Sequence, residues 1–430
     1  MSRIVNIRCV LLSSPYADAD DPEIKECFPN GPKRTIGMVE VTLEDGTTGL
    51  GEGYLAVFAP LVFKSIVDLC TPQVMFKNGF DIARRVQDLR SLCDYWSLQG
   101  AARHVIAAFE IALQDAKGKS LGQPVYDLLG GAKSDQIAIY GSGGCCDAKE
   151  QFQRELGELN TLGIKSYKIR SIKTDILRTV WVLEEAAKHG ISVGVDMCQN
   201  LADPPQAVDD VVSFVEAVHA LTNHRMIFVE EALGPDCPDE FRNLRGRIDV
   251  AVCGGEIITT PKEMIERINA DVYDFVQPDA SVMGGISAVM DVFEAAKSKG
   301  TDVVVHAWGG AAAIMASYHA AFAAGGKLVE YPMLAFPLGA EMIGDQGKII
   351  NGELLRPTAP GLGITLTKEM EARYPFDETE DKTAITYIAC VASKMKSSIK
   401  PWNTILKMSE STIVKKMDAL IEKNILLNPT

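Results

Sequence analysis

The sequence contains a succession of eight short apolar runs separated by longer amphipathic stretches, a pattern that few folds can accommodate. The runs occupy residues 137–140, 166–169, 191–195, 226–229, 249–252, 272–276, 302–305 and 327–329. Amphipathic stretches lie between most of them, for example at 175–189, 205–220, 261–269, 284–299 and 311–324. Eight rounds of strand and helix predict a parallel sheet closed into a (β/α)₈ barrel. The runs are nearly all apolar, which is typical of strands covered on both faces.

The first third of the chain has a different pattern. Residues 3–12 and 36–43 alternate between apolar and polar, and Asp45-Gly46 is a hairpin turn before a third strand at 47–52. From Leu61 to about Lys119 apolar residues recur every three or four positions, which predicts several helices. This region is therefore expected to be α+β.

Composition excludes several classes of protein. The 57 acidic residues outnumber the 43 Lys and Arg residues, giving a net charge of −14, so a basic nucleic-acid groove is not expected. A local group of cations still allows an anionic substrate. A membrane span needs roughly 20 apolar residues, and no run is that long. Arg3 and Arg8 interrupt any signal-peptide core, and the ten cysteines contain no C-x-x-C pair, so we expect a cytoplasmic protein with reduced thiols.

Nearly every predicted barrel strand ends in an ionisable side chain. From Lys168 onward these residues are spaced 28, 34, 26, 23, 27 and 24 apart, about one strand–helix unit each. The strand ends carry Lys168 and Arg170, Asp196, Glu230 and Glu231, Glu256, Asp279, His306 and Glu330. One charge at a strand end is ordinary, because strands stop where polar residues begin. Seven ionisable strand ends at regular intervals predict a single site, because the carboxyl ends of all barrel strands lie at the same mouth of the barrel.

Three of these acids suit a metal ion. Asp196, Glu230 and Glu256 follow successive strands, and three close carboxylates would repel one another without a bound cation. All-oxygen ligation favours Mg²⁺ first and Mn²⁺ second. Glu231 is the alternative to Glu230, but strand alternation sends neighbouring side chains to opposite faces, which favours Glu230.

His306 and Asp279 form a candidate general base. A carboxylate bonded to one imidazole nitrogen determines the tautomer and raises the basicity of the other nitrogen. No such partner is evident for the other histidines, His104, His189, His219, His224 and His319.

The remaining strand-end residues suit an anionic substrate. Lys168 and Arg170 are two apart on one strand face. Arg170 is always protonated, whereas Lys168 is either a second base or a ligand of the substrate carboxylate. Glu330, held protonated, would donate a hydrogen bond to that carboxylate; the alternative is a solvated strand-end acid.

Together these residues resemble the mandelate racemase branch of the enolase superfamily, over roughly residues 1–385. The resemblance includes Gly49-Leu50-Gly51-Glu52-Gly53 and the stretch from Ala107 to Gly131, AAFEIALQDAKGKSLGQPVYDLLGG. It implies an α+β capping domain at 1–130, a catalytic barrel at 131–350 and a segment at 351–390 that returns to the capping domain. It also implies capping loops at about 14–35 and 52–61 that select the substrate, Mg²⁺-assisted abstraction of a proton next to a carboxylate, and a symmetric homo-oligomer.

The sequence departs from the family pattern at three positions. Arg170 replaces the usual second lysine of the Lys-x-Lys motif on the second barrel strand. Cys198 stands where Asn commonly follows the acid of the third strand, and Ala232 stands where Pro commonly follows the acids of the fourth. Arg170 puts two-base racemisation in doubt. The resemblance assigns no role to the Lys-rich tail at 391–430. We interpret it as a solvated terminal helix around Ser409–Lys423, with a small winged-helix-like appendage as the alternative.

The resulting hypothesis is a sugar-acid dehydratase, a hydro-lyase that converts an aldonate or aldarate to a 2-keto-3-deoxy acid. Its base would be His306 with Asp279, and its metal ligands Asp196, Glu230 and Glu256. One alternative is a racemase or epimerase of a 2-hydroxy acid with Lys168 as the opposing base. A second is a binding protein that has lost catalysis and uses the tail to bind a partner.

Overall fold

The computed structural model describes residues 2–16, 33–145, 149–334 and 336–378. The Lys-rich tail, and most of the predicted capping loop at 14–35, lie outside these residues. Among the described residues, no helix is both long and apolar enough to cross a bilayer.

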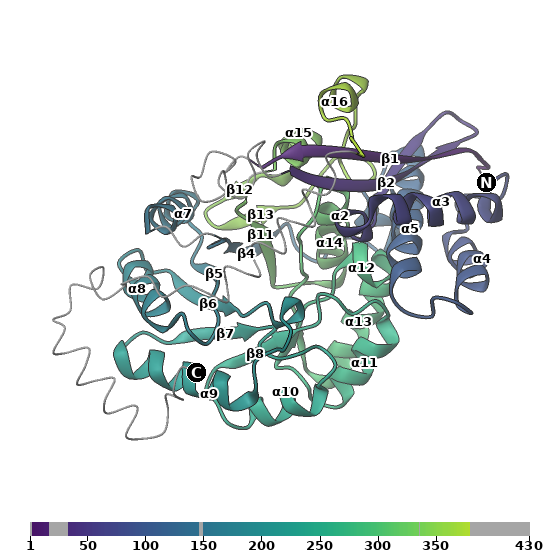
Figure 1. The fold of residues 1–430 in the computed structure, drawn as a ribbon. Helices are drawn as coiled ribbons and strands as arrows, with labels where there is room; N and C mark the ends of the chain where they lie inside the picture. The colour runs from purple at the N-terminus through teal and green to yellow at the C-terminus, as the bar shows by residue number, and fades with distance from the viewer. Residues whose placement is uncertain (1, 17–32, 146–148, 335, 379–430) are drawn as a thin grey trace. The chain divides into compact units, whose positions relative to one another are not determined.

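The N-terminal region has the predicted α+β composition (Figure 1). Three antiparallel strands form a sheet in the order β1-β2-β3. The turn between the last two contains Gly46 at φ +84° and Thr47, whose amide donates to Asp45 Oδ1 at 2.9 Å. The strands are β1 (Ile4–Pro15), β2 (Lys33–Leu43) and β3 (Thr48–Glu52), and the helices are α2 (Leu55–Phe58), α3 (Pro60–Val74), α4 (Ile82–Cys93), α5 (Ala101–Leu121) and α6 (Val125–Leu128).

Strand β3 and helix α5 are in direct backbone contact. A Cβ atom built on Gly51 would lie 2.0 Å from the carbonyl oxygen of Ala108, and one on Gly49 would lie 2.2 Å from that of Ala112. Only glycine fits such an approach, so the alternating glycines form the face of β3 that packs on α5. Leu50 and Glu52 consequently belong to the opposite face.

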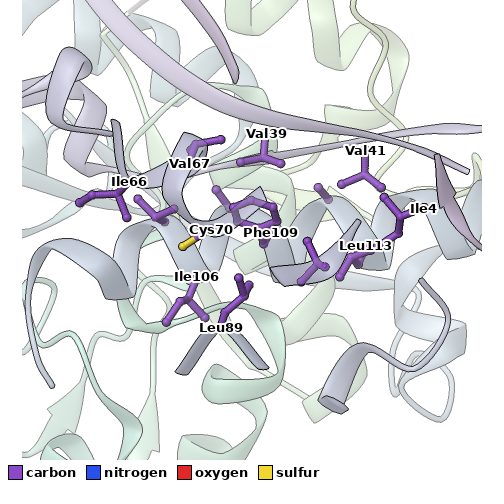
Figure 2. Packing of buried hydrophobic residues seen from close by; sticks show 14 of the residues in the cluster. Ile4, Val39, Val41, Ile66, Val67, Cys70, Leu89, Ile106, Phe109 and Leu113 are labelled. Carbon is purple, nitrogen blue, oxygen red and sulfur yellow. The ribbon is translucent and has the colours of Figure 1, made fainter. Parts of the chain in front are cut away.

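A hydrophobic core holds this region together (Figure 2). Phe109 and Leu113 of α5 lie beneath Val39 and Val41 of β2, and all four are at most 1% exposed. Each fully buried side chain of this kind contributes roughly 1.5–3 kcal/mol through loss of water contact.

The eight predicted barrel strands are present, each followed by a helix. The strands are β4 (Gln136–Ser142), β5 (Ser166–Arg170), β6 (Ser192–Asp196), β7 (Met226–Glu230), β8 (Ala251–Gly254), β9 (Phe275–Val276), β10 (Asp302–Val303) and β11 (Leu328–Pro332). The helices are α7 (Lys149–Leu162), α8 (Ile176–Ala187), α9 (Val208–Leu221), α10 (Pro238–Arg245), α11 (Pro261–Asn269), α12 (Ala280–Met283), α13 (Ile286–Lys299), α14 (Ala311–Ala324) and α15 (Pro337–Ile343).

The strand order follows the chain. It is β10-β9-β8-β7-β6-β5-β4, with β11 beside β4, and the pairings from β4 to β9 are parallel. An isolated parallel bridge joins Val305, just beyond β10, to Val329 of β11. This succession is that of a (β/α)₈ barrel, and Figure 1 shows β5 to β8 in the same order.

The segment after residue 350 contacts both the first barrel strand and the N-terminal region. Strand β13 (Glu353–Leu355) forms antiparallel pairs with β4 and with β12 (Ile349–Ile350). The sequence analysis did not predict these two short strands. Helix α16 (Lys368–Arg373) carries Glu371, whose carboxylate pairs with the Arg8 guanidinium at 2.8 Å.

By their contacts the described residues fall into two compact units. One consists of the described residues of Met1–Ala138, Glu256–Glu266 and Gln277–Ile388, and the other of those in Ile139–Gly255 and Arg267–Val276. The domain boundaries expected at 130 and 350 stay predictions.

Candidate active site

The ends of β5, β6 and β7 bring two cations and two acids together. The parallel register pairs Arg170 with Asp196, and Asp196 with Glu230, so these strand-end residues are neighbours. The Lys168 ammonium donates a short hydrogen bond to Glu230 Oε1 and lies 3.9 Å from Asp196 Oδ2. Arg170 Nε lies 3.7 Å from the same Asp196 oxygen. All four side chains are at most 11% exposed, so the charges interact at low solvent screening.

Glu256 joins Asp196 and Glu230 in an acidic group. It follows β8 by two residues, and one carboxylate oxygen from each of the three lies within 4.8 Å of the others. Mg²⁺ holds its oxygen ligands at about 2.0–2.1 Å, so these three carboxylates are close enough to share one such ion after small side-chain rotations. The donor set, three carboxylates with no thiolate or imidazole, suits Mg²⁺ or Mn²⁺.

Glu231 has a different position from its neighbour Glu230. Its backbone is left-handed, with φ +41°, and its Oε1 accepts the amide of Gly255 at 2.6 Å. The Glu231 carboxylate therefore supports the turn that leads into Glu256. This arrangement favours Glu230 as the ligand, as strand alternation predicted.

The second cluster contains the predicted base. Asp279 Oδ2 lies 2.7 Å from His306 Nδ1, and Asp279 Oδ1 accepts both the amide and the hydroxyl of Ser281, at 2.7 and 2.6 Å. The carboxylate thus has a partner on each oxygen and is 1% exposed. Such a carboxylate keeps the proton of neutral imidazole on Nδ1 and leaves Nε2 as the basic atom.

His306 Nε2 faces two further carboxylates. Glu256 Oε2 lies 3.2 Å away and Glu330 Oε2 lies 3.7 Å away. Burial lowers the pKa of His306, but the charges of Glu330, Glu256 and Asp279 outweigh burial and raise this pKa to about 10, so Nε2 is a strong base whenever the imidazole is neutral. Glu330 is fully buried and accepts the amide of Ala307 at 3.0 Å, so it is not the solvated acid considered as its alternative.

Two other histidines do have acidic neighbours, which corrects the sequence interpretation. His219 Nδ1 lies 3.5 Å from Asp249, and His224 Nε2 lies 3.7 Å from Glu184. Asp249 is 73% exposed and His224 is 44% exposed, so solvent screens both pairs. His319 has a structural role, since its Nδ1 accepts the amide of Tyr126 at 3.2 Å.

The sequence interpretation gave no role to Glu52 and Tyr54, which follow the β3 glycines. The Tyr54 ring lies edge-on to the His306 ring, with 6.5 Å between centroids. The Arg34 guanidinium lies 5.8 Å from the Tyr54 ring and 5.7 Å from the Trp308 ring, within cation–π distance of both. Glycine alternation alone would have indicated that Glu52 faces away from α5, but not what it contacts.

Comparison with known proteins assigns the family. Residues 26–130 match the mandelate racemase / muconate lactonizing enzyme N-terminal domain, and residues 151–370 match the enolase C-terminal domain-like family. The chain belongs to the mandelate racemase / muconate lactonizing enzyme family. Its fold is therefore an N-terminal α+β capping domain with a (β/α)₈ barrel, as predicted.

Curated relatives are named as enzymes that act on sugar acids. The chain is 26% identical over 342 residues to an arabinonate dehydratase of Saccharolobus solfataricus, covering 77% of this chain and 88% of the relative. It is 25% identical over 354 residues to an L-rhamnonate dehydratase of Saccharopolyspora erythraea, covering 79% and 85%.

Solved structures share the fold of this chain. The 3,6-anhydro-D-galactonate cycloisomerase of Zobellia galactanivorans superposes with a TM-score of 0.75 at 25% identity, covering 87% of this chain and 99% of that one. A mandelate racemase homologue of Bordetella bronchiseptica gives 0.77 at 22% identity, covering 90% and 97%.

Proposed function

We propose that the chain is a Mg²⁺-dependent sugar-acid dehydratase, a hydro-lyase that converts an aldonate or aldarate to a 2-keto-3-deoxy acid. The observation that carries the proposal is the His306–Asp279 pair, in which Asp279 binds Nδ1 and leaves Nε2 as the basic atom. Relatives named arabinonate and L-rhamnonate dehydratase support this reaction class.

Asp196, Glu230 and Glu256 would hold the Mg²⁺ ion. When bound, this ion would neutralise the substrate carboxylate and stabilise the negative charge that develops when the adjacent C–H bond breaks. The carbon acid next to a carboxylate is far too weak for imidazole alone, so this stabilisation is required.

The chain's own residues would supply the proton transfers. His306 Nε2 removes the α-proton, and the Asp279 carboxylate stabilises the resulting imidazolium. Lys168 and Arg170 bind the substrate carboxylate while it gains enediolate character, and Glu330, in its protonated form, donates a hydrogen bond to it. The imidazolium then protonates the departing β-hydroxyl, which leaves as water, and the enol tautomerises to the 2-keto-3-deoxy acid. One base serves both steps, since the imidazolium formed when it removes the α-proton is the acid that protonates the hydroxyl.

The racemase alternative needs a second base on the opposite side of the substrate carbon. Arg170 cannot fill this role because it is always protonated. Lys168 is the other candidate, and its ammonium donates to Glu230. The hydrogen bond from Lys168 to Glu230 favours elimination with a single base over racemisation with two. Solvent-isotope labelling distinguishes elimination from racemisation.

The test is a screen of sugar acids with purified protein and Mg²⁺ in D₂O, with detection of 2-keto-3-deoxy product. His306→Asn should abolish product formation, because the amide cannot accept the α-proton. Asp302→Asn is the matched control: its carboxylate is 66% exposed and pairs with Lys327. Full turnover by His306→Asn would reject the assignment. Inverted, deuterated substrate without keto product would establish racemisation, and absence of Mg²⁺ binding with tail-dependent capture of a partner would favour the binding protein.

A further inference from the structure

The segment Glu52–Tyr54 contacts the chain at two places, one just after His306 and the other just after Asp279. After His306, Glu52 Oε1 accepts a hydrogen bond from the amide of Gly310 at 2.7 Å, and Oε2 accepts one from the amide of Ala313 at 3.3 Å. Gly310 is only four residues after His306. The Glu52 carboxylate therefore anchors the loop that leaves the histidine.

After Asp279, the same segment contacts Ser281, the residue that holds the Asp279 carboxylate in place. The amide of Tyr54 donates to the carbonyl of Ser281 at 3.3 Å. Ser281 in turn donates two hydrogen bonds to Asp279 Oδ1. One short segment of the capping domain thus holds the loop after His306 and the residue that orients Asp279.

The packing around this segment leaves little freedom. Glu52 is 1% exposed, and a Cβ on Gly310 would lie 2.7 Å from its Oε2, so the carboxylate fills the space that a larger residue would need. A Cβ on Gly53 would lie 2.4 Å from the carbonyl oxygen of His104 on α5. Helix α5 on one face and the start of α14 on the other therefore determine where Glu52 lies.

We propose that Glu52 is a positioning residue for the His306–Asp279 pair, and that the capping domain aligns the catalytic base through it. This inference rests on the proposed function, in which His306 is that base. Loss of the two Glu52 hydrogen bonds would free the loop after His306, and a displacement of about 1 Å in a catalytic group costs up to roughly 100-fold in rate.

Glu110 provides a matched control. It is also a buried carboxylate of the capping domain at the start of a barrel helix, where it accepts the amides of Ile286 and Ser287 at 2.9 and 3.1 Å and the Ser287 hydroxyl. Its partners begin α13, seven residues beyond Asp279. Glu52→Gln and Glu110→Gln each weaken the hydrogen bonds between a buried carboxylate and backbone amides near the start of a helix. Only Glu52→Gln should affect the catalytic base.

The test compares both variants in the full chain by steady-state kinetics and by ¹H NMR. The NMR experiment follows the downfield resonance of the His306 Nδ1 proton, assigned by its loss in His306→Asn. Glu52→Gln should lower kcat by roughly 10- to 100-fold with KM within about twofold, and should shift or broaden this resonance. Glu110→Gln should lower stability while kcat and the resonance stay at wild-type values. If Glu52→Gln does not fold, Gly310→Ala, which displaces the carboxylate without removing it, should show the same pattern.

Each outcome separates this proposal from the proposed function. Equal behaviour of the two Gln variants in kcat and in the NMR resonance would overturn the positioning role and leave Glu52 as a structural cap. If the wild-type protein dehydrates no sugar acid, the proposed function fails, while the NMR comparison still decides whether Glu52 holds His306 and Asp279 together.

Discussion

His306 Nδ1 and Asp279 Oδ2 lie 2.7 Å apart, and the second oxygen of that carboxylate is held by Ser281. Because Asp279 has partners on both oxygens, it cannot rotate without losing hydrogen bonds. The imidazole is therefore held in one orientation, with Nε2 directed at the carboxylates of Glu256 and Glu330. This pair is the centre of the proposed chemistry.

Asp279→Asn should lower kcat by about 10²- to 10⁴-fold, the usual contribution of general acid–base catalysis. The amide cannot stabilise the imidazolium and no longer determines which nitrogen carries the proton. Formation of keto product and exchange of the substrate α-proton with D₂O should fall together. The control is Asp274→Asn, whose carboxylate binds Arg245 and the amide of Val252 and should affect stability alone. Wild-type exchange by Asp279→Asn would contradict the role of this pair.

Glu256→Gln should weaken binding of Mg²⁺ and Mn²⁺, because one of the three anionic oxygens is lost. A ligand present at 100 times its Kd stabilises the folded state by about 2.7 kcal/mol, so Mn²⁺ should raise the Tm of the wild-type protein. The variant should show a smaller shift at the same Mn²⁺ concentration, as measured by differential scanning calorimetry. Glu216→Gln, an exposed change on α9, should behave like wild type. Identical Tm shifts in all three proteins would argue against the acidic group as the metal site.

The stability difference between the wild-type protein and Glu52→Gln should depend on pH. Burial raises the pKa of Glu52 from 4.5 to about 7, against the hydrogen bonds from Gly310 and Ala313. Between these two values the folded state binds more protons than the unfolded state, so the wild-type protein loses stability as pH rises through this window. One pKa unit corresponds to about 1.4 kcal/mol, so the loss is at most roughly 3 kcal/mol.

Urea denaturation of both proteins at pH 5, 6, 7 and 8 would measure this effect. The free energy of unfolding of Glu52→Gln should rise relative to wild type as pH increases, because glutamine does not titrate. A difference that stays constant over this range would show that Glu52 has an ordinary pKa in the folded protein.

Gly51→Ala should destabilise the capping domain by about 3 kcal/mol, the upper end of the usual cost of overpacking. Its Cβ would lie 2.0 Å from the Ala108 carbonyl oxygen and 2.4 Å from the Ala112 amide, and backbone atoms of α5 cannot move aside independently. Gly157→Ala on α7 is the matched control, since a Cβ there meets nothing within 4 Å. It should stabilise the protein by about 0.5–1 kcal/mol through helix propensity. A neutral Gly51→Ala in thermal unfolding would contradict the packing of β3 on α5.

Local patterns predicted the elements well where strands are long, and poorly where tertiary pairing decides. The run predicted at 166–169 forms β5 at Ser166–Arg170, whereas the run predicted at 272–276 forms a strand only at Phe275–Val276. Strand β13 escaped prediction because its three residues gain their hydrogen bonds from β4, far away in the sequence.

The repeating strand–helix pattern could be inferred from the order of residues. The same pattern gave the spacing that brings a set of ionisable residues to strand ends: Lys168, Asp196, Glu230, Glu256, Asp279, His306 and Glu330. Hydrophobic periodicity and strand polarity are local properties, so they can be inferred without coordinates. Three contacts could be seen only in the folded chain: Glu231 supports the turn before Glu256, Ser281 holds Asp279, and Glu52 anchors the loop after His306. These contacts depend on which hydrogen-bond donors the fold brings within reach of a buried carboxylate. The pattern of apolar and polar residues along the chain does not specify those distances.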